Sequence, residues 1–198
     1  MVAASAVTDL LLDKQEKFRY NKYRTVSPKK LKKNEVKKMI TIYTDGSTRE
    51  KNQRGASNKG GYGYVVYDDN IIIDAYSEQV ENTTNNEMEL MALIAVIEKY
   101  GTEDDWGCPE VYSDSMYAIN CLTNWAYTWE LNNWYRANGK PIENLALVQK
   151  GYSLLKSNTH NVNINYCKGH NGIEGNELAD KLATGEISAE EVLNKYGR

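Results

Sequence analysis

The sequence contains few cysteines and no long hydrophobic run. Its three cysteines are odd in number and form no C-x-x-C pair, so we expect free thiols of a reducing compartment and neither a disulfide framework nor a zinc site. The longest apolar run, Leu90–Ile97, is too short to span a bilayer. The N-terminus lacks the basic segment that opens a secretory signal. These absences predict a cytoplasmic protein with no membrane partner.

Phenylalanine is nearly absent as well, since the 198 residues hold 1 Phe against 15 Tyr and 4 Trp. Tyrosine and tryptophan keep a polar group, so part of this aromatic content is expected on a contact surface and not in the core. The hydrophobic share of 41% and the charged share of 26% are ordinary for a globular protein. This length predicts one well-packed domain with appendages.

Charge is divided unevenly along the chain. Residues 1–38 carry 11 Lys and Arg against 4 Asp and Glu, a balance of +7, while the rest carry 13 against 23, a balance of −10 that brings the total to −3. We interpret residues 1–38 as a basic N-terminal arm, disordered at least in part. Its Lys and Arg, interleaved with Phe18, Tyr20 and Tyr23, suit contacts to nucleic acid. A solvated tail has the same composition, so both interpretations stay open.

The stretch MITIYTDGS, residues 39–47, has the β-branched and aromatic composition of a strand and ends at an Asp-Gly pair. Asp45 and Gly46 are typical of a hairpin turn. A carboxylate at the end of an apolar strand is also a natural place to hold a metal ion. Two further strands are predicted at 62–67 and 71–80, with the short connection of an antiparallel meander.

The segment ENTTNNEMELMALIAVIEKYG predicts a helix that begins after Thr84 and ends at Gly101. Thr84 and Glu87 match a capping box, which explains Glu87. Glu89 has no such explanation, because it lies inside the apolar stretch 88–97 and a buried carboxylate needs a partner. A metal ion is one candidate for that partner.

Two more carboxylates accompany predicted elements. Asp114 follows the short strand EVYS and precedes a helix that runs to about residue 123, so it is either an N-cap or a ligand. Pro141 is expected to open another helix that runs to about residue 155. After a strand in HNVNINYC, a Gly-rich loop leads to a helix with Asp180, which is either a ligand or a solvated charge beside Lys181.

The predicted order of elements is three strands, a helix, a strand, two helices, a strand and a helix, which indicates an α/β fold. Strands one, four and five are joined through helices and can lie parallel, while strands two and three add as hairpins. Ligands gather at the carboxyl ends of parallel strands, so Asp45 and Asp114 are expected to be neighbours. The helices with Glu89 and Asp180 can bring two more carboxylates there. Residues 186–198 are predicted to form a C-terminal amphipathic helix.

Four segments in this order, TDGS, TTNNEMELMA, YSDS and KGHNGIEGNELAD, resemble type 1 ribonuclease H (the RNase HI family). The resemblance covers residues 39–185 as a catalytic domain. It implies the ribonuclease H-like fold, a five-stranded mixed sheet of three antiparallel and two parallel strands flanked by helices. It also implies an endoribonuclease that hydrolyses the RNA strand of RNA–DNA hybrids and leaves 5′-phosphate and 3′-hydroxyl ends. The expected partner is therefore an RNA–DNA hybrid, and the expected state is a monomer.

The resemblance implies roles for individual residues. The family's four metal-binding carboxylates, which hold two Mg²⁺ ions with Mn²⁺ as a substitute, correspond to Asp45, Glu89, Asp114 and Asp180. His170 corresponds to the family's loop histidine, which assists proton transfer or product departure. The residues expected to contact the substrate are Gly46, Ser47, Thr84, Asn85, Asn86, Trp125 and Trp129.

The chain departs from the family pattern after the second tryptophan. Bacterial members place several Lys and Arg there, where this chain has Glu130, Leu131, Asn132 and Asn133. We expect the basic arm, residues 1–38, to compensate by electrostatic attraction to the hybrid, and Trp134 to pack within the helix junction. A catalytically silent hybrid-binding module is the alternative to an enzyme, although clustered negative charge gives a pure phosphate binder no advantage. Another nuclease or recombinase of the same broad fold is a third interpretation.

Overall fold

The computed structural model describes residues 39–49, 59–101, 106–157 and 161–197, all within one compact unit. The predicted basic arm lies outside the described residues. No helix in the described ranges is long and apolar enough to cross a membrane. The described elements are, in chain order, β1 (Ile40–Arg49), β2 (Lys59–Asp68), β3 (Ile71–Glu81), α2 (Asn85–Tyr100), β4 (Glu110–Ser113), α3 (Met116–Asn120), the π-helical turn η2 (Cys121–Trp125), α4 (Ala126–Leu131), α5 (Leu145–Lys156), β5 (Asn163–Tyr166), α6 (Glu174–Thr184) and α7 (Ala189–Tyr196).

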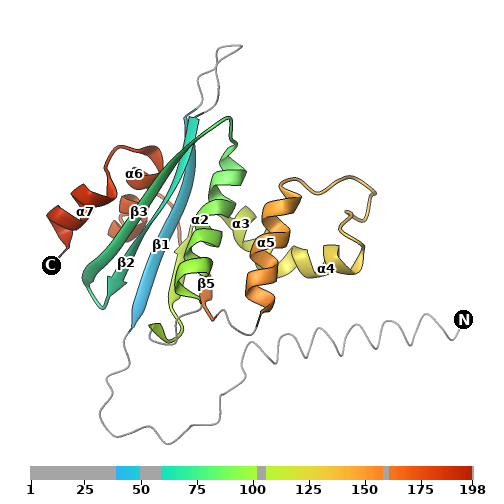
Figure 1. Ribbon diagram of the computed structural model, residues 1–198, viewed down its shortest axis with the longest axis horizontal. Helices are drawn as coiled ribbons and strands as arrows, with labels where there is room; N and C mark the ends of the chain where they lie inside the picture. The colour runs from blue at the N-terminus through green and yellow to red at the C-terminus, as the bar shows by residue number, and fades with distance from the viewer. Residues whose placement is uncertain (1–38, 50–58, 102–105, 158–160, 198) are drawn as a thin grey trace, which may run out of the picture. The chain divides into compact units, whose positions relative to one another are not determined.

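The five strands form one sheet in the order β3-β2-β1-β4-β5. β2 lies antiparallel to both β1 and β3, whereas β4 lies parallel to both β1 and β5. The three long strands form a continuous hairpin ladder, and the two short strands return through helices (Figure 1). The predicted α/β fold, a five-stranded mixed sheet flanked by helices, is confirmed.

Helices cover both faces of the sheet (Figure 1). On one face, Ile42 and Val66 pack with α2, α3 and α5 in the main core. On the other, Val65 packs with Leu182 of α6 and Val192 of α7. The neighbours Val65 and Val66 belong to different cores because successive side chains of a strand point to opposite faces. Both faces are apolar, so the sheet is a rigid support for whatever lies at its ends.

Capping boxes stand at the start of α2, as expected, and at the start of α7. Thr84 accepts the backbone N–H of Glu87, and the Glu87 carboxylate accepts the N–H of Thr84 at 2.8 Å. Ser188 and Glu191 make the same reciprocal pair before α7. Each cap satisfies N–H groups that the helix itself cannot pair, which contributes about 1 kcal/mol. The start of α2 is therefore held in place, and this matters because Glu89 lies in its second turn.

Two helix boundaries differ from the predictions. The helix predicted to end near residue 123 continues through η2 and α4 to Leu131, because a π-helical turn joins the two α-helical pieces. The helix predicted to open at Pro141 begins instead at Leu145. Pro141 pairs with Tyr135 in an isolated β-bridge. Proline suits an extended segment as well as a first helical turn, and the tertiary contact decides between them.

Candidate active site

Asp45 and Asp114 lie just past the last parallel pair of β1 and β4. Tyr43 of β1 pairs with Tyr112 of β4, and their rings stack with centroids 5.3 Å apart. Asp45 lies two residues beyond Tyr43 in β1, and Asp114 follows Ser113, the last residue of β4.

Asp45 lies in the middle of β1, which continues to Arg49. The predicted end of this strand at Asp45, and the hairpin turn at Asp45 and Gly46, are therefore wrong, because both residues pair with β2. Ser115, and not Asp114, accepts the N–H of Ala118 as the N-cap of α3. The capping interpretation of Asp114 is therefore wrong, and the predicted neighbourhood with Asp45 is present.

Glu89 reaches the same place because α2 runs very close to β1. A Cβ on Gly46 would stand 2.1 Å from the carbonyl carbon of Met88, so only glycine permits this approach. The Glu89 carboxylate accepts hydrogen bonds from the Asn85 amide at 2.7 Å and from the Ser115 hydroxyl at 2.5 Å. These bonds supply the partners that a half-buried carboxylate requires.

The loop and helix after β5 bring further residues to Asp114. Asn176 of α6 is 2% exposed, and its amide donates to Asp114 Oδ2 at 3.3 Å. A Cβ on Gly169 would lie 2.3 Å from the same oxygen, so the loop backbone also touches this carboxylate. Asp180 lies four residues after Asn176, one helical turn on, and therefore on the same side of α6. His170 is exposed on the loop with φ of 49°, and its charge acts on Asp180.

Burial and like charges act together on these carboxylates. Burial is the largest cause that raises the pKa of Asp45 to about 8, and the charge of Asp114 is the next. Asp180 and Glu89 add to the rise, while the hydrogen bond from the Gly46 N–H opposes it. Burial also raises the pKa of Glu89 and that of Asp180, and Asp114 contributes to both. Asp45 and Asp114 therefore lie within electrostatic reach of each other and of both Glu89 and Asp180.

The donor chemistry of this cluster suits a divalent metal ion. Carboxylate oxygens are the ligands that Mg²⁺ and Mn²⁺ prefer. In the described part of the chain, no group of three or more His, Cys, Asp and Glu side chains is gathered tightly enough to hold a metal ion as it stands. Carboxylates repel one another unless a cation lies between them, and this repulsion adds to the effect of burial in raising the pKa of Asp45. The residues thus fit a metal by their chemistry, in an open arrangement that a cation would draw together.

One group of predicted substrate contacts surrounds this cluster. Gly46 and Ser47 continue β1 directly after Asp45. Thr84, Asn85 and Asn86 lie at the start of α2, and the first two are exposed. Asn85 is hydrogen-bonded to Glu89, which links this group to the carboxylates. The Thr84 hydroxyl serves as the helix cap, so its competing structural role is real.

A second group lies on the helices after β4. Trp125 is 42% exposed, and its ring centroid lies 5.8 Å from that of Trp129 and 6.4 Å from that of Tyr117. Trp134 packs on Tyr152 of α5, with centroids 6.2 Å apart, as predicted. Trp125 is therefore exposed, whereas Trp129 and Trp134 are half-buried and pack against the main core, although the sequence contains all three within ten positions.

Glu130 is not a free acidic charge on these helices. Its carboxylate pairs with Lys156 of α5 at 2.8 Å and accepts a hydrogen bond from the Tyr152 hydroxyl at 3.4 Å. Glu130, at a position where the resemblance leads us to expect a basic side chain, thus ties α4 to α5. The sequence pattern alone does not reveal this structural role.

Three residues at the site are missed by the sequence reasoning. Ser115 donates to Glu89, and Asn176 donates to Asp114. The Cys167 thiol donates in turn to Asn176 Oδ1 at 3.2 Å. Burial, followed by the charges of the nearby aspartates, raises the pKa of Cys167 to about 11. For Asn176 alone the sequence holds a signal, because it lies one helical turn before Asp180 and hence on the same side of the helix.

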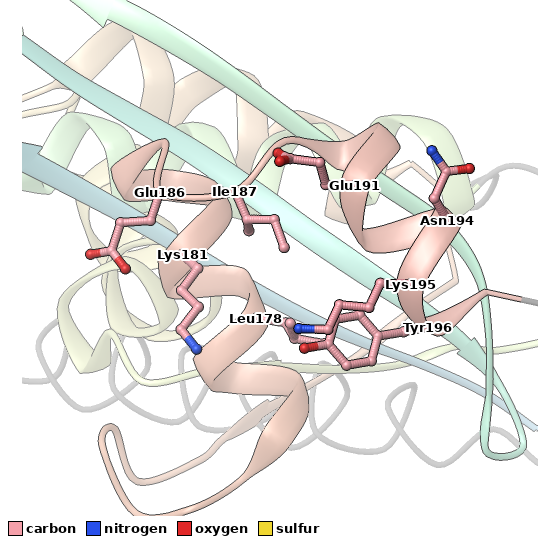
Figure 2. A pocket seen from close by; sticks show the side chains of 8 residues that line it. All are labelled: Leu178, Lys181, Glu186, Ile187, Glu191, Asn194, Lys195 and Tyr196. Atoms are coloured by element: carbon pink, nitrogen blue, oxygen red, sulfur yellow. The ribbon is translucent and has the colours of Figure 1, made fainter.

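A separate hollow of about 510 Å³ lies between α6 and α7. Figure 2 shows its side chains, which come from both helices and from the short segment that joins them. Lys181 and Lys195 contribute positive charge, and Glu186 and Glu191 balance it. Of the described residues that line it, none is a predicted site residue. The hollow therefore adds no donor to the carboxylate cluster.

Comparison with known proteins identifies the family of this chain. The family described as RNase H matches residues 37–188. The ribonuclease H of Ruthia magnifica subsp. Calyptogena magnifica is 38% identical over 146 residues, which cover 73% of this chain and 92% of that protein. The ribonuclease H of Francisella tularensis subsp. novicida (strain U112) is 35% identical over 152 residues, or 77% of this chain and 93% of that protein.

Two solved structures share the fold. LC9-RNase H1, a type 1 RNase H with the type 2 active-site motif, has a TM-score of 0.61 and 28% identity, over 77% of this chain and 73% of that one. The PFV RNase H domain has a TM-score of 0.63 and 26% identity, over 75% of this chain and 94% of that one. The chain therefore belongs to the ribonuclease H family, as its four characteristic segments predict.

Proposed function

We propose that this chain is an endoribonuclease that hydrolyses the RNA strand of RNA–DNA hybrids with two divalent metal ions and leaves 5′-phosphate and 3′-hydroxyl ends. Membership of the family supports ribonuclease activity on such hybrids in general. The observation that carries the finer proposal is the convergence of four carboxylates: beyond the effect of burial, Asp114, Asp180 and Glu89 each raise the pKa of Asp45. A protein that only bound phosphates would gain nothing from negative charge concentrated at its site.

The four carboxylates would hold the metal ions. They come from β1, α2, the end of β4 and α6, so the packed sheet and helices set their spacing. Bound there, two divalent ions would activate water at neutral pH and offset the negative charge that develops at the scissile phosphate. The half-buried Glu89 keeps its orientation through Asn85 and Ser115. Asp114 keeps its own through Asn176.

His170 would move a proton at the edge of the cluster. It is exposed on the loop before α6, and its charge reaches Asp180. Histidine is the side chain best suited to proton transfer near neutral pH. At this position it can donate to the departing 3′ oxygen or assist the departure of the product.

Asn85 and Asn86 would distinguish RNA from DNA. The 2′-hydroxyl is both a donor and an acceptor, and a neutral amide can meet it in either role. The Asn85 Nδ2 already donates to Glu89. No donor among the described residues is recorded for Oδ1, which can therefore accept a hydrogen bond from a 2′-hydroxyl. A ribose contact would then be coupled directly to a metal-binding carboxylate. The exposed face of Trp125, with Trp129 beside it, offers an apolar surface to the DNA strand.

The proposal also covers the domain bounds, the N-terminal arm, the oligomeric state and the metal ion. We take residues 39–185 as that domain, and residues 1–38 as a basic arm that strengthens hybrid binding. The functional state would be a monomer in the cytoplasm. Mg²⁺ would be the physiological ion, with Mn²⁺ able to replace it.

The test is cleavage of end-labelled RNA in four settings, namely an RNA–DNA hybrid, a single strand, an RNA duplex, and the hybrid with EDTA. We expect internal cuts in the hybrid alone and none with EDTA. Asp114→Asn should reduce the rate by more than about 100-fold, because loss of an outer-shell partner of a metal ligand alone costs about 10- to 100-fold. Treating the products with a 5′-phosphate-specific exonuclease identifies their ends.

Two other outcomes would replace this proposal. Tight binding of the hybrid without cleavage, with or without added Mg²⁺ or Mn²⁺, would establish the silent binding module. Cleavage that ignores the DNA strand would show that Asn85 and the tryptophan pair do not select the substrate as described.

A further inference from the structure

The Asn176 carboxamide lies between a buried thiol and Asp114. Asn176 is 2% exposed and Cys167 is 7% exposed. The Cys167 thiol donates to Asn176 Oδ1 at 3.2 Å, and Asn176 Nδ2 donates to Asp114 Oδ2 at 3.3 Å. One line of hydrogen bonds thus runs from the residue after β5 through α6 to Asp114, which follows β4 and lies 62 residues before Asn176 in the chain.

The direction of this carboxamide matters for Asp114. An amide has a donor end and an acceptor end of nearly equal size. If the Asn176 side chain turned over, its oxygen would face the Asp114 carboxylate and repel it. Among the described residues, the Cys167 thiol is the donor recorded for Asn176 Oδ1. The thiol therefore favours the orientation in which Oδ1 of Asn176 faces Cys167 and the amino group faces Asp114.

The backbone around Cys167 and Asp114, the two partners of the Asn176 carboxamide, is held in place. The backbone N–H of Cys167 donates to the Ser113 carbonyl at 3.0 Å, which extends the β4–β5 ladder and fixes the thiol next to Asp114. Gly169 crowds the Asp114 carboxylate from the loop side, since a Cβ there would lie 2.3 Å from Oδ2. Asp114 consequently has little room to adjust if the amide is misdirected.

We propose that Cys167 is a positioning residue, whose thiol holds the Asn176 carboxamide with its amino group toward Asp114 and so keeps that carboxylate aimed for metal binding. The hydrogen-bond part of this inference stands on the contacts above. The metal part rests on the proposed function. The thiol takes no part in the chemical step, because it touches Asn176 and not the reacting atoms.

The test compares three variants of the full chain. Cys167→Val keeps the size of the side chain and removes the donor, whereas Cys167→Ser keeps a donor. Cys121→Val is the matched control, because Cys121 is another buried cysteine that lies in the main core. Thermal melting verifies that each variant is folded, and Cys167→Ala replaces the valine variant if that one does not fold.

The readouts separate positioning from mere packing. The side-chain NH₂ resonances of Asn176, assigned by their absence in Asn176→Ala, should move in Cys167→Val and stay near their original positions in Cys167→Ser. Mg²⁺ affinity from calorimetry should fall about 3- to 10-fold in the valine variant, less than the loss of a direct outer-shell partner, because a thiol is a weak donor. The serine variant should recover most of the affinity, and Cys121→Val should lose none.

A double-mutant comparison gives the decisive result. In an Asn176→Ala background, Cys167→Val should cause no further loss of Mg²⁺ affinity, because the thiol acts only through the amide. An equal loss in both backgrounds, no rescue by serine, or unmoved Asn176 resonances would each overturn the inference. If the unmodified chain neither binds Mg²⁺ nor cleaves the hybrid, the proposed function fails, while the Asn176 resonances still decide whether the thiol orients the amide.

Discussion

Asp45→Asn should stabilise the metal-free protein, because the ionised carboxylate is unfavourable in the folded state. Burial and the neighbouring carboxylates raise the pKa of Asp45 from 3.8 to about 8. The folded state therefore keeps a proton between about pH 4 and pH 8 that the unfolded state releases. By linkage, the wild-type protein loses stability as the pH rises through this range and loses no more above it. Asparagine is neutral at every pH and escapes this loss.

The size of the effect follows from the same values. A pKa difference of about four units corresponds to about 6 kcal/mol at pH 8.5, at about 1.4 kcal/mol for each unit. Side-chain relaxation and water near the half-open site reduce this upper bound, so we expect a gain of about 2–3 kcal/mol. For a domain of this size, that gain corresponds to a rise in Tm of about 5–10 °C. At pH 5 the upper bound on the destabilisation by Asp45 falls below about 2 kcal/mol, so Asp45→Asn should raise the Tm less than at pH 8.5.

The assay is thermal unfolding of both proteins in EDTA at pH 5 and pH 8.5, followed by circular dichroism. Asp69→Asn is the matched control, because it removes the same charge from an exposed turn between β2 and β3. Adding Mg²⁺ should raise the Tm of the wild type more than that of Asp45→Asn, since the ion binds the intact cluster. Equal Tm values for Asp45→Asn and the wild type at pH 8.5, or a gain no larger than that of the control, would refute the electrostatic reasoning.

Three further predictions concern the substrate and the loop. Gly169→Ala should lower kcat about 10- to 100-fold with little change in Tm, because its Cβ would displace Asp114 Oδ2, 2.3 Å away; a kcat close to that of the wild type would show that the loop yields. Deletion of residues 1–38 should raise KM for the hybrid at moderate salt and leave kcat nearly intact, and an unchanged KM would contradict the proposed arm. Trp125→Ala should raise KM with little loss of stability, whereas Trp134→Ala should lower the Tm because it removes the packing on α5; the same response from both would contradict their separate roles.

Features that depend on nearby residues were predictable from the sequence. The strand composition before Asp45, the Thr84–Glu87 capping box and the apolar surroundings of Glu89 are all local patterns. Together they separate the two glutamates, because a cap explains Glu87 and leaves Glu89 in need of a partner. The structure agrees, since Glu87 caps α2 while Glu89 accepts bonds from Asn85 and Ser115. The parallel order of β1, β4 and β5 also follows from connections that a helix must make.

Features that depend on distant residues required the tertiary structure. The π-helical turn η2 and the bridge of Pro141 to Tyr135 arise from packing, and the same residues would suit other local conformations. The bond from Asn176 to Asp114 joins positions 62 residues apart, and its geometry is set by sheet register and by the approach of α6. Composition and periodicity carry no record of such a contact. The sequence by itself thus determined which carboxylates gather, and the tertiary structure decided which neutral side chains hold them in place.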